Sequence, residues 1–175
     1  MRRALLPLLC LVLAAALLSG CSSQQARLEE SLAVVCQGQA VAEAAAYTGG
    51  GPHPIVLLSS SGGHHSWSSQ VDSTWLPESV SEVQLVACVG EQEERSIEVC
   101  HYNGPDITRY IYQVSVRIVA AQTGVTVATE TIAGDRPREC RSSEDYDLTR
   151  LEGSDVSYGD VQSWMSAYVT NPAAK

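Results

Sequence analysis

Polar and apolar residues alternate most regularly in the stretch "TRYIYQVSVRIVAA", residues 108–121. One face of this stretch is mainly apolar and the other mainly polar: Tyr110, Tyr112, Val114, Val116 and Ile118 share the first, and Arg109, Gln113, Ser115 and Arg117 lie mainly on the second. A period of two is typical of a strand with one face on a core. The pattern therefore predicts one long strand at the centre of the domain.

A hairpin is expected directly after this strand, where "QTG" (122–124) leads into "VTVATETIAG". Gly124 suits the left-handed residue of a type I turn followed by a bulge, which pairs Ile118 with Ala128 and Val114 with Ile132. A two-residue Thr-Gly loop would instead place Arg117 opposite Glu130. We favour the bulge, because Thr-Gly lacks the Asn or Asp of a tight primed turn.

Three other segments also have strand patterns. "IVLLS" (55–59) is a buried strand, and "VSEVQLVACV" (80–89) is apolar on both alternating sets, so we expect it to be covered on both faces. "SIEVCHY" (96–102) alternates and ends at "NGPD" (103–106), a strong turn signal. The acidic "GEQEER" (90–95) is expected to form a solvated hairpin tip.

Helical signals lie at both ends of the domain. Ser157 and Asp160 have the spacing of a capping box. An apolar stripe follows, formed by Tyr158, Val161, Trp164, Met165 and Tyr168, and Asn171-Pro172 ends it. Near the other end, residues 28–36 have helical spacing, although "AVVC" also suits the start of a strand.

Together these elements predict an α+β domain: an antiparallel β-meander of about four to five strands with a C-terminal helix packed on it. No internal repeat and no second domain is visible, so residues 28–175 are expected to form a single domain.

The first 21 residues, "MRRALLPLLCLVLAAALLSGC", have a basic start, an apolar run and small residues before a cysteine, which is the layout of a secretory signal. "LSGC" resembles the lipobox of bacterial lipoprotein precursors. The resemblance implies that residues 1–20 are a signal peptide, that Cys21 is acylated, and that residues 21–27 include a polar tether. The alternative is a plain secretory signal with a chance cysteine.

The net charge of the chain limits the classes of partner that it can bind. The chain has a formal charge of −9, which becomes −11 if Arg2 and Arg3 leave with the signal. An acidic surface argues against nucleic acid and against electrostatic docking on anionic lipid. The lipid on Cys21 would then supply the contact with the cell membrane or outer membrane.

Cysteine usage agrees with export. Cys36, Cys88, Cys100 and Cys140 remain when Cys10 and Cys21 are set aside, and an even number in an exported domain indicates two disulfides. Three connectivities are possible. Cys88 and Cys100 lie on consecutive expected strands, so one arrangement bridges them locally and joins Cys36 to Cys140. The spacings contain no C-x-x-C pair, which disfavours a zinc site or a redox-active pair.

The stretch "SSSGGHHSW" (59–67) contains residue types found in active sites. It lacks a carboxylate partner, the G-x-S-x-G turn that exposes a nucleophile, and the lysine of a phosphate loop. We interpret it as a solvated loop in which Trp67 is a packing anchor. The candidate metal ligands are His64, His65 and, through the fold, His101, and His53 is a further histidine that would need the fold to bring it to them.

The segments "HPIVLL", "VCHY", "ITRYIYQVSV" and "GDRPREC" resemble uncharacterised bacterial extracytoplasmic proteins, a resemblance that implies no function. The sequence thus predicts an exported, membrane-anchored lipoprotein, a binding or structural module of the cell envelope whose partner is an envelope protein or glycan. No cofactor and no catalytic residue is expected. The alternative hypothesis is a metal-binding enzyme or sensor that uses His64 and His65.

Overall fold

The computed structural model describes residues 24–145, 147–171 and 173. Residues 24–32 are helical and continue into the 3-10 helix η1. The remaining elements are listed in chain order: η1 (Ala33–Gln37), β1 (Ile55–Ser59), η2 (Ser66–Gln70), η3 (Ser73–Trp75), η4 (Val80–Glu82), β2 (Leu85–Val89), β3 (Glu93–Cys100), β4 (Ile107–Ala120), β5 (Thr126–Ala133), β6 (Arg150–Glu152) and α2 (Tyr158–Val169).

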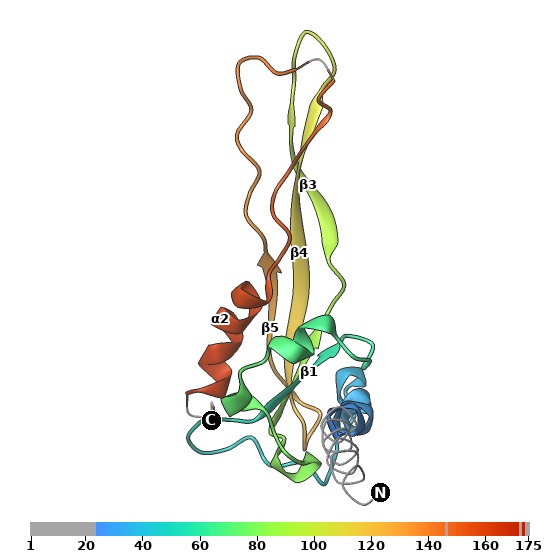
Figure 1. Ribbon diagram of the computed structural model, residues 1–175, viewed down its shortest axis with the longest axis vertical. Coiled ribbons are helices and arrows are strands. Elements are labelled where there is room, and N and C mark those ends of the chain that lie inside the picture. The colour runs from blue at the N-terminus through green and yellow to red at the C-terminus, as the bar shows by residue number, and fades with distance from the viewer. Residues whose placement is uncertain (1–23, 146, 172, 174–175) are drawn as a thin grey trace, which may run out of the picture.

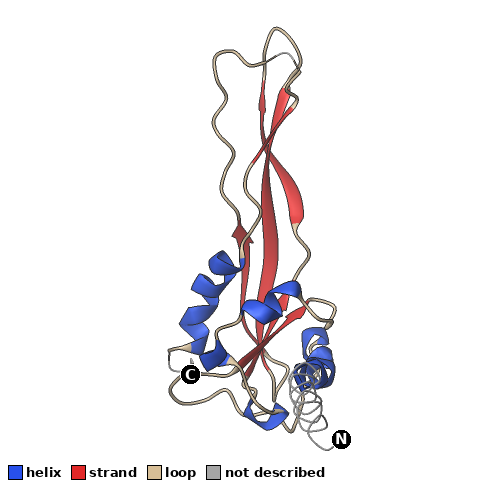
Figure 2. Cartoon of the chain, viewed as in Figure 1, coloured by secondary structure: helices blue, strands red, loops and turns tan. Residues whose placement is uncertain are grey.

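The molecule has a packed body at one end and a long, narrow arm at the other (Figures 1 and 2). We define the arm as β3, residues 107–113 of β4, and the segments 101–106, 134–145 and 147–153, the last of which contains β6. The helix at 24–32 lies in the body, at the end away from the arm tip. None of the helices in the described ranges is long and apolar enough to cross a membrane.

The fourteen-residue strand β4 is the spine of the whole sheet, as the alternating pattern predicts. Along one edge of β4, β2 pairs with residues 116–120 and β3 pairs with residues 107–113. Along the other edge, β5 pairs with residues 113–119 and β6 with residues 108–110. The long strand therefore belongs to the body at its end and to the arm at its start.

The α+β class and the C-terminal helix are confirmed, but the sheet is mixed and has six strands. The expected antiparallel meander is wrong because β1 runs parallel to β2, and β6 runs parallel to β4. Both parallel pairs join segments that are distant in sequence. Such pairs carry no local turn signal, because parallel strands need long crossover connections.

The acidic segment 90–95 is not a hairpin tip. β2 and β3 do not pair with each other; they follow one another along the same edge of β4. Glu93 and Glu94 are the first residues of β3, opposite Gln113 and Tyr112.

The hairpin between β4 and β5 has the expected register. Ile118 pairs with Ala128 and Val114 with Ile132, and the pairing shifts between Ile118 and Val119. Gly124 has a φ of 70° and donates its N–H to the carbonyl of Ala120 at 2.9 Å. The bulged turn is therefore confirmed, and Arg117 lies opposite Thr129 instead of Glu130.

Two apolar clusters cover the two faces of the body sheet. One contains alternate residues of β1, β2 and β4 together with α2, and Trp67 packs against it. The other contains the opposite residues of β1 and β2 together with Leu32, Val35 and Cys36. All five residues of β2 are buried, so the predicted strand over 80–89 is covered on both faces at residues 85–89, whereas residues 80–82 form η4 instead.

Helix α2 begins as the sequence predicts. The hydroxyl of Ser157 accepts from the backbone N–H of Asp160, and the Asp160 side chain accepts from the backbone N–H of Ser157. Tyr158, Val161, Met165 and Val169 are buried, and Trp164 and Tyr168 pack at the edge of the cluster. The helix ends at Val169; Pro172 lies outside the described residues.

All four remaining cysteines form disulfides, Cys36–Cys88 and Cys100–Cys140. The local Cys88–Cys100 arrangement does not occur. Cys88 lies opposite Arg117 and Cys100 opposite Ile107 on the same strand. Ten residues of extended chain span about 33 Å, far more than a disulfide bridges. One disulfide therefore lies in the body and the other in the arm.

Candidate binding site at the ends of two parallel strands

The loop at residues 59–67 begins where β1 ends and folds back on itself. Ser59 donates its N–H to the carbonyl of Gly63 at 2.8 Å, and Gly62 donates to the carbonyl of Ser59 at 2.8 Å. Gly62 has a φ of +90°, and a Cβ there would lie 2.4 Å from the carbonyl oxygen of Ala33. Glycine is required at this position both for its conformation and for its close approach to the N-terminal helical segment.

The loop lies beside the end of β2, because β1 and β2 are parallel and Ser59 pairs with Val89. Ser60 donates its N–H to the carbonyl of Val89 at 2.6 Å. A cavity of about 370 Å³ lies between the loop and residues 89–92. Its lining residues are Ser59, Ser60, Ser61, His65, Ser66, Trp67, Val89, Gly90, Glu91, Gln92 and Val114.

A second cavity of about 520 Å³ also has Ser60, Gly90 and Glu91 in its lining, so the two adjoin. It includes Arg117, whose guanidinium donates to the carbonyl of Cys36. The first cavity, past the carboxyl ends of β1 and β2 and beside Trp67, is called the groove below, whereas the second lies on the opposite face of the sheet with Cys88 and Arg117. In open sheets, ligands bind in crevices of this kind, outside the carboxyl ends of parallel strands.

His65 and Trp67 form an aromatic pair in the first cavity, with ring centroids 4.8 Å apart. The Nδ1 atom of His65 accepts from the backbone N–H of Trp67 at 3.2 Å, which begins the 3-10 helix η2. Burial, and then the neighbouring His64, lower the pKa of His65. The ring is therefore neutral at neutral pH, with its proton on Nε2. The prediction that Trp67 packs on the core is confirmed, since it lies against the cluster under α2.

The serines of this loop are not arranged for catalysis. The hydroxyls of Ser59 and Ser61 are 2.9 Å apart, and Ser59 also accepts from the N–H of Gly63. Ser68, just beyond the loop, donates to the carbonyl of Leu57 at 2.8 Å and is buried. These contacts hold the loop on β1 and do not activate a nucleophile.

The four histidines lie in separate environments. His64 pairs with the buried carboxylate of Glu29 at 2.9 Å, and His101 pairs with Asp106 at 3.0 Å at the arm tip. His53 is fully buried and bonds to Gln84 at 2.7 Å and to the carbonyl of Asn171 at 3.0 Å. Within residues 24–145, 147–171 and 173, no three side chains of His, Cys, Asp or Glu form a metal-binding group. His64, His65 and His101 are therefore not brought together.

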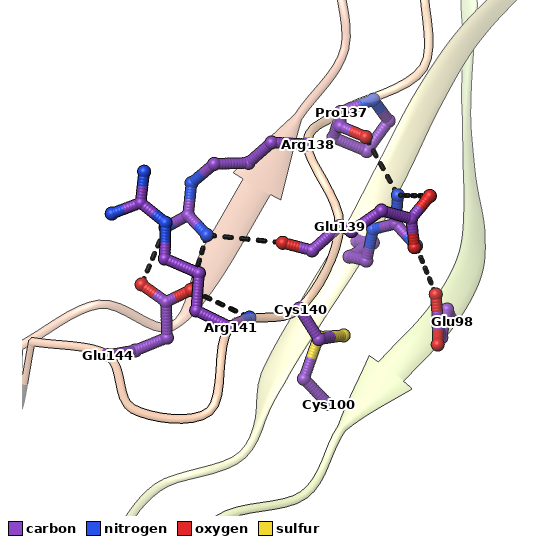
Figure 3. Close-up of polar contacts among 9 residues, drawn as sticks. Glu98, Cys100, Pro137, Arg138, Glu139, Cys140, Arg141 and Glu144 are labelled. Carbon is purple, nitrogen blue, oxygen red and sulfur yellow. Dashed lines mark hydrogen bonds and ion pairs between the residues drawn. A yellow bond between two sulfur atoms is a disulfide. The ribbon is translucent and has the colours of Figure 1, made fainter.

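The arm contains a buried arginine that sequence reasoning placed on the sheet surface. Arg109 is 3% exposed. Its guanidinium donates to Glu98 on β3, to the carbonyl of Pro137 at 2.7 Å, and to Glu139 at 3.3 Å (Figure 3). Glu98 is the cross-strand partner of Arg109 in the β3–β4 register. The turn at 103–106 predicts a hairpin between β3 and β4 but does not set which residues face each other. The sequence therefore does not predict the pair of Glu98 and Arg109.

A disulfide also joins the segment after β5 to β3, and an ion pair lies within the segment itself (Figure 3). The Cys100–Cys140 disulfide joins it to the end of β3. Within the segment, Arg138 makes a two-pronged ion pair with Glu144. On β6, where it pairs with Thr108, Arg150 makes ion pairs with Glu94 and Glu152, and its guanidinium lies over the Tyr110 ring, 4.4 Å from the centroid.

Comparison with known proteins identifies no relative: no family model, no curated protein and no solved structure matches the chain.

Proposed function

We propose that the chain is a lipid-anchored lipoprotein of the bacterial cell envelope, and that its arm binds another envelope component. The anchor rests on the lipobox-like residues 18–21, with acylation at Cys21. Two disulfides support this assignment, because structural disulfides persist in oxidising compartments outside the cytoplasm.

The arm is the observation that carries the binding role. A two-stranded hairpin outside a core is marginally stable by itself in water. This chain uses a disulfide, the Arg109 cluster and the Arg150 ion pairs to hold such a hairpin rigid. The body has its own apolar clusters, and neither includes an arm residue. A stiffened projection that adds nothing to the core is best explained by contact with a partner.

The direction of the arm agrees with this role. Residue 24 is three residues after Cys21, so it cannot lie more than about 11 Å from the lipidated position. The helix that starts there is at the end of the molecule opposite the arm tip (Figure 1). With Cys21 in the membrane, the arm would be directed away from it, and residues 107–113 alone extend it by about 23 Å.

Site-specific photocrosslinking in the native host tests the proposal. A benzoylphenylalanine at position 102, in the tip segment, should give an adduct with an envelope protein or with cell-wall material. The matched control is the same residue at position 125, which is 61% exposed in the β4–β5 turn at the opposite end. No adduct at position 102, or equal adducts at both positions, would contradict an arm-directed interaction.

A further inference from the structure

The groove at the ends of β1 and β2 has features that the arm does not explain. It is concave, it lies in the body, and it combines a large aromatic ring with a lining of hydroxyl, carboxylate and imidazole groups. Its volume of about 370 Å³ is in the range of small-molecule sites.

The charges of the lining restrict the ligand. Among the residues that the structure describes, no Lys or Arg lines the cavity beside Trp67, and the lining contains the carboxylate of Glu91. Phosphate and carboxylate ligands are held most strongly by cationic side chains such as Arg and Lys. Arg117, in the adjoining cavity, already donates to the carbonyl of Cys36. The favoured ligand therefore carries no net negative charge.

The available polar groups match a ligand with many hydroxyls. Ser60, Ser66 and Glu91 are exposed in the groove, whereas Gln92 is held by Asp155 and by the N–H of Val156. Serine hydroxyls both donate and accept, Glu91 accepts, and the neutral His65 ring donates from Nε2. This mixture serves hydroxyl groups, which themselves both donate and accept.

Trp67 supplies the apolar half of such a site. It is only partly buried: it packs against the core, 6.4 Å from the Tyr158 ring between centroids, and also lines the cavity. Its backbone N–H donates to Nδ1 of His65, and its ring lies 4.8 Å from the His65 ring between centroids. An immobilised aromatic ring provides contact area at little entropic cost, and a sugar ring presents a C–H face that packs on such a surface.

We propose that this cavity binds a sugar ring of a neutral glycan, stacked on Trp67 and hydrogen-bonded by Ser60, Glu91 and His65. The groove binds the sugar without cleaving it. Glycoside hydrolysis uses a pair of carboxylates, and within the described part of the chain Glu91 is the one carboxylate that lines the cavity beside Trp67. The proposal depends on none of the arm residues, so it can succeed or fail separately from the arm interaction.

The test is an NMR titration of the purified domain with chitotetraose, cellotetraose and maltotetraose, each up to about 10 mM, the range of weak single-site binding. Saturable shifts of the amides at 59–67 and 89–92 with at least one of them are expected. Trp67→Ala should weaken binding by about tenfold or more. The matched control is Trp164→Ala, which removes a partly buried tryptophan from the same apolar cluster but leaves the groove intact.

A second variant, Ser60→Tyr, keeps the test valid if Trp67→Ala fails to fold. Ser60 is exposed, so a tyrosine there should fill the groove and abolish binding while the melting temperature is kept. The proposal is overturned if none of the three oligosaccharides shifts these amides. It is also overturned if inorganic phosphate alone shifts them, or if Ser60→Tyr binds as tightly as the parent.

Discussion

His65 has a local structural role, and its protonation is coupled to folding. Its Nδ1 accepts from the N–H of Trp67, and burial followed by the proximity of His64 lowers its pKa. An unfolded histidine has a pKa of about 6.5. Between the lowered folded pKa and 6.5, the unfolded chain therefore binds more protons than the folded protein.

This difference predicts a pH dependence of stability. The free energy of unfolding rises with pH when the unfolded state binds more protons, so the His65 contribution is present above about pH 6.5 and falls as the pH is lowered toward the folded pKa. His65→Asn keeps an acceptor for the N–H of Trp67 but removes the titration. Urea unfolding at several pH values between about 5 and 7.5 should give a shallower slope for this variant; an unchanged slope would refute the assignment.

Arg109 shows where residue-level reasoning fails. Alternation along 108–121 separated the two faces correctly in the body, where Val114, Val116 and Ile118 are buried together. In the arm the same rule placed Arg109 on the surface. Arg109 is covered by residues 137–139, which are more than 25 positions away in the sequence, and no local sequence pattern predicts that contact.

The two carboxylates on Arg109 should not be equivalent. Glu98 lies directly opposite on β3, whereas Glu139 is 86% exposed and reaches Arg109 only at 3.3–3.4 Å. Glu98→Gln removes the charge nearest to a buried guanidinium, so it should increase amide hydrogen exchange in residues 134–145 several-fold. Glu139→Gln is the matched control and should change exchange little. If both variants increased exchange equally, Glu98 and Glu139 would contribute to the stability of the arm only through their summed charge.

Helix α2 is the element that the sequence described best, because its signals are local. The capping box at Ser157 and Asp160 and the buried stripe are both present in the structure. The bulged β4–β5 turn was predictable for the same reason, because Gly124 lies in the turn and the turn sets the register in which β4 and β5 pair. By contrast, the β1–β2 pair is joined through residues 60–84, and sequence periodicity does not indicate which strands become neighbours or in which direction.

Loss of the N-cap should destabilise the protein through α2. Ser157→Ala removes the acceptor for the N–H of Asp160 and should lower the free energy of unfolding by about 1 kcal/mol. Ser163→Ala is the control: this exposed hydroxyl donates to the carbonyl of Gly159 within the helix, and alanine has the higher helix propensity. Chemical denaturation should separate the two variants, and a Ser157→Ala protein as stable as its parent would refute the role of the cap.

The division into body and arm organises the whole molecule, and the two disulfides follow it. Cys36 and Cys88 are buried in one of the body clusters, while Cys100–Cys140 ties the segment after β5 to the arm. The cysteine count predicted two bridges, but their pairing depends on β2 and β3 lying end to end along β4. That arrangement is a property of the assembled sheet, so it could not be read from the spacing.

Removing each disulfide should therefore have a different consequence. Replacing Cys36 and Cys88 with alanine should lower global stability by about 4 kcal/mol on the chain-entropy argument. Replacing Cys100 and Cys140 should instead open the arm locally, so hydrogen exchange and protease cleavage rise in residues 94–112 and 134–145 while the body melts as before. A single cooperative loss of structure in both double variants would show that body and arm unfold as one unit.

The placement of the arm relative to the membrane depends on lipid at Cys21, which can be tested directly. Two or more acyl chains hold a protein stably at a membrane, and the cysteine of "LSGC" is the only one that the lipobox resemblance marks for acylation. In cells fed an alkynyl fatty acid, the protein should become labelled. Cys21→Ala should abolish this label, and mass spectrometry should no longer detect the cleaved and acylated form. Cys10→Ala, which changes a cysteine inside the same apolar run, should retain both. Label that persists in Cys21→Ala would remove the anchor, and with it the argument that the arm is directed away from the membrane.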